Sequence, residues 1–128
     1  MPVDKNMKIL VVDDFKTMTR LIDSLLRQLG FTNIEEAASG QAAMEKLQKD
    51  KYQLVLSDWN MEPMDGLELL RQVRASETLK SLFFILITAE SKPENILAAK
   101  KAGVNNYIVK PFNANTLKEK LTAVFGAF

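Results

Sequence analysis

The side chains best suited to chemistry in this chain are carboxylates that follow two apolar runs. Asp13 and Asp14 follow Lys8–Val12, and Asp58 follows Leu54–Ser57. The first run is rich in β-branched residues, and the second is too short for a helix and leads into a loop with proline and glycine. Both runs therefore predict buried strands of a parallel sheet. Ligands of open α/β sheets bind at the carboxyl ends of the strands, so we expect these carboxylates to meet at one edge.

Two further predicted strands end in groups that complement the carboxylates. Phe83–Thr88 ends in the hydroxyl of Thr88, and Asn106–Pro111 places Lys110 before a proline. Clustered carboxylates repel one another unless a cation lies among them, and oxygen ligands without histidine or cysteine select Mg²⁺. A nucleophilic oxygen, Mg²⁺, an ammonium and a hydroxyl are together what phosphoryl transfer requires.

Each of these residues also has a simpler explanation. Asp14 could cap the following helix, Thr88 could merely end a strand, and Lys110 could be a solvated loop residue. Asp65–Gly66 predicts a turn and a helix start, and we keep that interpretation. The simpler explanations leave unexplained why several different strands all end in groups capable of chemistry.

Composition excludes several classes of function. The 128 residues predict one domain over residues 1–128 with no output domain. The net charge of +1 argues against a nucleic-acid surface, and the absence of cysteine and histidine excludes disulfides, thiol nucleophiles and the usual zinc sites. Because no apolar run reaches the roughly 18 residues of a membrane span and no signal peptide begins the chain, we expect a cytoplasmic monomer that does not bind membranes.

Strands and helices are predicted to alternate along the chain. The strands are expected at Lys8–Val12, Asn33–Ala37, Leu54–Asp58, Phe83–Thr88 and Asn106–Pro111. The helices are expected over Phe15–Leu29, after Ser39–Gly40, over Gly66–Ala75, from a capping box at Ser91–Glu94 to Gly103, and after a cap at Asn113 or Asn115. The alternation predicts right-handed crossovers and a parallel sheet covered on both faces, with the more polar Asn33–Ala37 at an edge.

Five motifs then support a family assignment. Val11–Phe15, Ser57–Met61, Met64–Gly66, Thr88–Glu90 and Val109–Phe112 resemble, in order, the motifs of two-component response regulator receiver domains. The resemblance runs from about Lys8 to Phe125. With Trp59, Tyr107 and no output domain, the chain is most similar to the stand-alone receivers of chemotaxis. The resemblance implies a flavodoxin-like (βα)5 doubly wound sheet with strand order 2-1-3-4-5.

The resemblance also implies a metal and phosphoacceptor site. Asp58 would accept a phosphoryl group from a chemotaxis sensor histidine kinase. Asp14, Asp58 and the backbone carbonyl of Asn60 would bind Mg²⁺ directly, and Asp13 would hold it through water. The Asn60 side chain would influence the hydrolysis of the phosphorylated form. The protein would thus be a signalling switch that catalyses only its own phosphorylation and dephosphorylation.

The resemblance implies further roles in the response to phosphorylation. Lys110 would pair with the phosphoryl group and Thr88 would move to bond it, while Tyr107 would swing inward. The Glu90 side chain would affect hydrolysis, and Trp59 would neighbour the site. The surface offered to a flagellar motor switch protein would include Ile96, Tyr107 and Lys120. A phosphatase is a further expected partner.

Two departures from the family pattern bear on function. Met61-Glu62-Pro63-Met64 replaces the usual order, in which proline directly follows the methionine. We expect Glu62 to alter Mg²⁺ affinity or the loop, which the exchange Glu62→Pro with Pro63→Asn would test through Mg²⁺ binding. Pro93 stands where lysine is usual and Lys100 where alanine is usual, so we expect weakened binding to the motor switch.

Three alternatives stay open. An aspartate-nucleophile phosphatase would also use a Mg²⁺-bound carboxylate, but it resembles its own family through Asp-x-Asp rather than the adjacent Asp13-Asp14. A flavodoxin-type carrier would need a hydroxyl- and glycine-rich phosphate loop, where this chain has Asp-Asp-Phe-Lys-Thr. A receiver that serves as a phosphate sink without touching the motor is the third alternative, and Lys100 counts in its favour.

Overall fold

A parallel sheet forms the centre of the protein. The computed structural model describes residues 4–89 and 92–126, and its five strands lie in the order β2-β1-β3-β4-β5 with every pairing parallel. The strands are β1 (Ile9–Val12), β2 (Ile34–Ala37), β3 (Leu54–Asp58), β4 (Phe83–Thr88) and β5 (Asn106–Val109). The predicted flavodoxin-like topology is confirmed.

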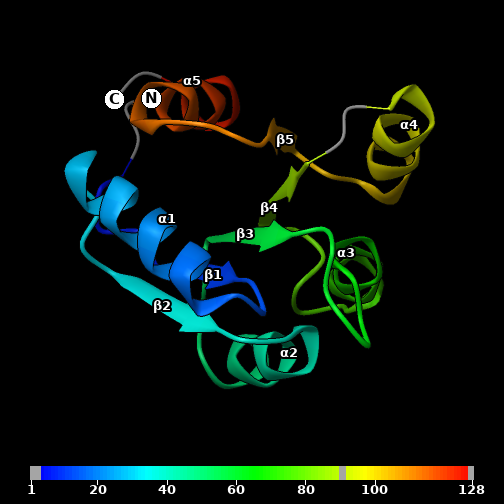
Figure 1. The fold of residues 1–128 in the computed structure, drawn as a ribbon. Helices are drawn as coiled ribbons and strands as arrows, with labels where there is room; N and C mark the ends of the chain where they lie inside the picture. The colour runs from blue at the N-terminus through cyan, green and yellow to red at the C-terminus, as the bar shows by residue number, and fades with distance from the viewer. Residues whose placement is uncertain (1–3, 90–91, 127–128) are drawn as a thin grey trace.

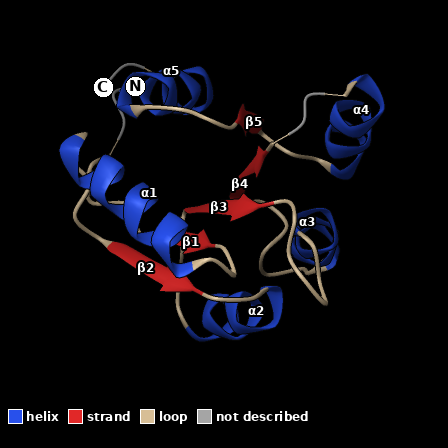
Figure 2. Cartoon of the chain, in the orientation of Figure 1, coloured by secondary structure: helices blue, strands red, loops and turns tan. Residues whose placement is uncertain are grey.

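The helices form a layer on each face of the sheet. They are α1 (Lys16–Gln28), α2 (Gly40–Lys49), α3 (Gly66–Ala75), α4 (Pro93–Ala102) and α5 (Ala114–Phe125). Helices α1 and α5 cover one face, and α2, α3 and α4 cover the other (Figures 1 and 2). None of the described helices is long and apolar enough to cross a bilayer.

Burial on both faces explains the uninterrupted apolar strands. In β1, Ile9 and Val11 join the core under α1 and α5, while Leu10 and Val12 join the core under α2, α3 and α4. A strand covered on both sides needs apolar residues at every position rather than at alternate ones. The partly exposed β2 lies at an edge, as its polar sequence predicted.

Most predicted helix starts are confirmed by their caps. The side chains of Ser39, Asp65 and Asn113 accept hydrogen bonds from main-chain amides in the first turns of α2, α3 and α5. Asn113, not Asn115, is therefore the cap of α5. These caps satisfy amides that a helix cannot bond internally.

The starts of two helices differ from what the sequence suggested. The residue that precedes α1 is Phe15, so the simple capping explanation for Asp14 fails. The residue that precedes α4 is Lys92, without a side-chain capping bond, whereas the predicted cap Ser91 lies outside the described residues. Pro93 opens that helix as expected, since its missing amide hydrogen is not needed there.

Candidate functional site

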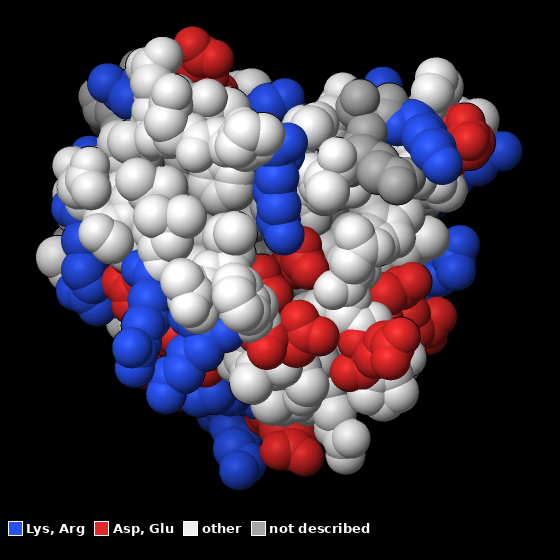
Figure 3. Space-filling model, viewed as in Figure 1, with Lys and Arg blue, Asp and Glu red and all other residues white. Residues whose placement is uncertain are grey.

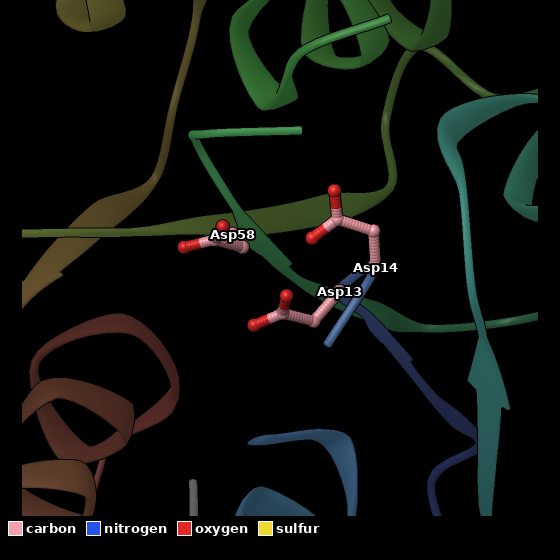
Figure 4. A group of neighbouring side chains, drawn as sticks. All are labelled: Asp13, Asp14 and Asp58. Atoms are coloured by element: carbon pink, nitrogen blue, oxygen red, sulfur yellow. The ribbon is translucent and has the colours of Figure 1, made fainter. Parts of the chain in front are cut away.

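The three predicted carboxylates meet at the carboxyl ends of β1 and β3. Oxygen atoms of Asp13, Asp14 and Asp58 all lie within 4.8 Å of one another, and Figure 4 shows their side chains gathered where the two strands end. Asp13 and Asp58 are buried, with 2% and 3% of their surface exposed, whereas Asp14 is exposed. The cluster is therefore held inside the fold but open to solvent on one side.

Burial, together with repulsion from the neighbouring carboxylates, raises the pKa of Asp13. The burial and the charges of Asp58 and Asp14 bring this pKa to about 6, against the lowering effects of a hydrogen bond from the Phe15 amide and of the charge of Lys110. The Phe15 amide donates to Oδ1 of Asp13 at 3.0 Å. A cation placed among the carboxylates would remove this repulsion.

Two buried carboxylate oxygens lack hydrogen bonds among the described residues. They are Oδ2 of Asp13 and Oδ1 of Asp58. Buried polar atoms without partners are unfavourable unless an ion or a water molecule supplies the missing interaction. A cluster of three carboxylates in which Oδ2 of Asp13 has no partner among the described residues suits a hard divalent cation such as Mg²⁺, so the residues present fit the expected metal.

Lys110 reaches the cluster as predicted. Its ammonium nitrogen lies 2.7 Å from Oδ1 of Asp58. This ion pair is the contact recorded for that buried oxygen, which forms no hydrogen bond with the described residues. The main chain sets this position, since the Lys110 amide donates to the Thr88 carbonyl at 2.8 Å.

Thr88 and Trp59 also lie next to Asp58 of β3. Thr88 is the buried last residue of β4, which pairs with β3 so that Asp58 lies opposite Ile87. Trp59 is partly buried, and its amide donates to the Ile87 carbonyl at 2.8 Å. Asn60 follows and is exposed.

The predicted output residues lie apart from the acidic cluster. Ile96 and Lys100 belong to α4, and Lys120 belongs to α5. Tyr107 on β5 is partly buried, with the Lys120 ammonium 4.7 Å from the centre of its ring. The predicted Glu90 lies outside the described residues.

The positions of the surface hollows coincide only in part with the acidic cluster. A hollow of 260 Å³ beside the cluster is lined by Asp13, Asp14, Lys16, Thr19, Glu36, Ala37 and Ala38. A larger hollow of 860 Å³ lies between residues 47–53 and 78–83, at the amino ends of β3 and β4. The volume of the hollows alone would point to the wrong end of the sheet, because the carboxylates, Thr88 and Lys110 lie at the carboxyl ends of the strands.

Sequence reasoning missed the glycines that shape this site. A Cβ on Gly66 would clash with the carbonyl oxygen of Asp58 and lie 2.9 Å from Cα of Trp59. The Gly66 amide also donates to the Trp59 carbonyl at 2.9 Å. Gly66 therefore lets the loop pack directly on the main chain of Asp58, whereas the sequence signal indicated only a turn and a helix start.

Comparisons with known proteins agree with this geometry. The model of the response regulator receiver domain family matches residues 9–122. The chain belongs to this family. Chemotaxis protein CheY-3 of Vibrio cholerae is 54% identical over 123 residues, covering 96% of this chain and 95% of the relative. Chemotaxis protein CheY of Pseudomonas aeruginosa is 52% identical over 119 residues, covering 93% and 96%.

Solved receiver structures have the same fold. The chemotaxis response regulator CheY4 of Vibrio cholerae superposes with a TM-score of 0.87 at 33% identity, covering 94% of this chain and 99% of that one. The receiver domain of the sensor histidine kinase PA1611 from Pseudomonas aeruginosa, solved with a magnesium ion coordinated in the active-site cleft, has a TM-score of 0.83 at 28% identity and covers 95% and 99%. Membership of the CheY-like receivers argues against the phosphatase and flavodoxin alternatives.

Proposed function

We propose that this chain is a chemotaxis response regulator in which Asp58 accepts a phosphoryl group from a sensor histidine kinase in a Mg²⁺-dependent reaction. The observation that carries the proposal is the buried Asp58 carboxylate, which has two further aspartates and an ammonium at 2.7 Å around it. The names of the similar chemotaxis proteins support the signalling pathway. The chain then acts in the cytoplasm as a switch rather than as an enzyme for other substrates.

Each residue has a defined part in this reaction. Asp14, Asp58 and the Asn60 carbonyl would hold Mg²⁺, with Asp13 acting through water, and the metal would supply positive charge to the phosphoryl oxygens. A carboxylate oxygen of Asp58 forms the new bond to phosphorus. The bond from phosphorus to the donor histidine breaks, and its electron pair returns to the imidazole.

Phosphorylation then changes the contacts of Lys110 and Thr88. The charge on residue 58 goes from −1 to nearly −2, and it gains three acceptor oxygens. Lys110 exchanges its ion pair with the carboxylate for one with the phosphoryl group, and the Thr88 hydroxyl moves to bond the same group. The motion of Thr88 leaves space for Tyr107, which carries the signal to α4, β5 and α5.

The partners follow from the same surfaces. A sensor histidine kinase supplies the phosphoryl group, a phosphatase removes it, and a flagellar motor switch protein reads the α4, β5 and α5 face. Pro93 and Lys100 are both exposed on α4. A second function, a phosphate sink that competes for kinase output, is favoured by Lys100, because a long charged side chain opposes docking there.

The test is a titration with Mg²⁺ and then acetyl phosphate, followed by the fluorescence of Trp59, the one tryptophan of the chain. We expect Mg²⁺ to quench the emission and acetyl phosphate to change it further only when Mg²⁺ is present. Asp58→Asn should abolish the second change. A response to acetyl phosphate that persists in Asp58→Asn or without Mg²⁺ would refute the proposal.

A further inference from the structure

We propose that Gly40 is a positioning residue for the metal-binding loop, because it leaves the space in which Met64 packs. The inference rests on the proposed function, since it concerns the Mg²⁺ site of that reaction. Gly40 is the buried first residue of α2, far in sequence from the loop between β3 and α3 that contains Met64. The contact joins these two segments, and Figure 1 shows the loop beside the start of α2.

The backbone does not require glycine at position 40. The described glycines with left-handed backbone angles are Gly30, Gly103 and Gly126, and Gly40 has an ordinary helical start capped by Ser39. Alanine is more favourable than glycine in a helix. The absence of a side chain must therefore serve a neighbour rather than the helix.

That neighbour is the whole side chain of Met64. A Cβ on Gly40 would lie 2.6 Å from Sδ of Met64, 3.0 Å from its Cγ and 3.1 Å from its Cβ. Rotation of the flexible end of methionine would relieve the contact with sulfur. It would not relieve the contact with Cβ, which moves only with the main chain, so an added methyl group must displace the loop or the helix.

Met64 is well placed to determine the shape of the loop. At the near end the Met61 side chain is buried and its amide donates to the Trp59 carbonyl at 3.2 Å. At the far end Asp65 caps α3. Glu62 and Pro63 between them are exposed. Met64, which lies against Gly40, therefore joins the loop to the first turn of α2.

The loop also carries a proposed metal ligand. The Asn60 carbonyl lies in the same short segment, and the exposed Asn60 side chain gives it no buried anchor of its own. Supporting contacts that orient ligands strongly affect metal affinity. A displacement at Met64 should therefore reach the site as weaker Mg²⁺ binding.

The experiment is a double-mutant cycle read by Mg²⁺ titration of Trp59 fluorescence. We expect Gly40→Ala to weaken Mg²⁺ binding about tenfold when Met64 is present. In a Met64→Ala background the same substitution should weaken it less, by about two- to threefold, because the contacts with Sδ and Cγ are gone and only the contact with Cβ remains. Urea denaturation of each variant separates this effect from general loss of stability.

Met44→Ala is the matched control. Met44 lies on α2 and packs against the same core cluster as Met64. Gly40→Ala should keep its full effect on Mg²⁺ affinity in the Met44→Ala background. Equal losses with and without Met64, no loss at all, or relief by Met44→Ala would each overturn the inference.

Two further outcomes are also decisive. If Gly40→Ala does not fold, Met64→Ala is compared with Met44→Ala: weaker Mg²⁺ binding only in Met64→Ala supports the inference, and equal binding overturns it. If the unaltered protein shows no Mg²⁺-dependent change, the proposed function itself fails. Mg²⁺ binding that is intact and insensitive to position 40 removes only the inference.

Discussion

At the scale of single residues, the protonation of Asp13 links the site to folding. Its pKa is about 6 in the folded protein against the usual 3.8. The folded state therefore holds this proton more tightly than the unfolded state. Stability falls as the pH rises between these values, and the loss is complete above them. A pKa difference of one corresponds to about 1.4 kcal/mol, so this difference corresponds to roughly 3 kcal/mol.

Asp13→Asn should accordingly stabilise the metal-free protein. We expect the free energy of unfolding at pH 7.5 to rise by about 1–3 kcal/mol, because the amide carries no charge into the cluster and its oxygen can still accept from the Phe15 amide. Urea denaturation in EDTA measures this gain, which should shrink as the pH falls toward 4. A gain of equal size at both pH values would contradict the electrostatic explanation. The exposed Asp14→Asn is the comparison variant and should change the pH dependence less.

At the scale of the elements, Arg74 joins α3 to two loops at the amino ends of the strands. This end of the sheet is opposite the acidic cluster. Its guanidinium donates to the carbonyls of Lys80 and Leu82 at 3.1 and 2.5 Å, to the Gly103 carbonyl at 2.9 Å, and to Oδ1 of Asn105 at 2.9 Å. Burial lowers the pKa of Arg74. The loop before β4 and the end of α4 are thus held by one side chain.

Arg74→Met should therefore destabilise the fold without disturbing the site. We expect a loss of about 2–4 kcal/mol in urea denaturation, because several carbonyls lose a charged donor at once. Mg²⁺ affinity should stay within about twofold of that of the unaltered protein, since the acidic cluster lies at the other end of the strands. Arg71→Met, an exposed arginine on the same helix, is the control and should change stability by less than about 0.5 kcal/mol. Similar losses in both variants would show that the bonds of Arg74 contribute little.

The elements themselves were predictable because their signals are local. Apolar runs such as Phe83–Thr88, and caps such as Asp65, depend on residues a few positions apart, so the strands and most helix starts follow from the sequence. The meeting of the aspartates followed from one topological rule about strand ends. The hydrogen bonds of Arg74 and the packing of Met64 on Gly40 join segments that lie far apart in the sequence. No periodic pattern in the sequence predicts contacts of this kind. Such contacts become visible only when the helices have been placed.

At the scale of the whole molecule, the charges are nearly balanced but separated. Figure 3 shows acidic side chains gathered over the carboxyl ends of β1 and β3, with basic side chains on the adjoining side below α1. The overall charge of +1 gives no indication of this arrangement. A local negative field would attract divalent cations to the proposed site, while the proposed output face lies at the far edge of the sheet with α4, β5 and α5. The proposed input and output surfaces are therefore different, and we expect that they can be altered separately.

Lys100→Ala should change the output without changing the input. Lys100 is exposed on α4, one turn after Ile96, so both side chains lie on the same strip of the helix. A partner that docks on this strip must desolvate the ammonium, so we expect Lys100→Ala to tighten binding of a motor-switch peptide about three- to tenfold after phosphorylation. Fluorescence anisotropy of a labelled peptide measures the affinity. Lys101→Ala is the control, because Lys101 is exposed on the same helix but does not lie in line with Ile96. It should leave the peptide affinity unchanged. Mg²⁺ affinity should be the same in the unaltered protein and in both variants. Tight binding by the unaltered protein that Lys100→Ala does not improve would mean that the lysine is accommodated in the complex.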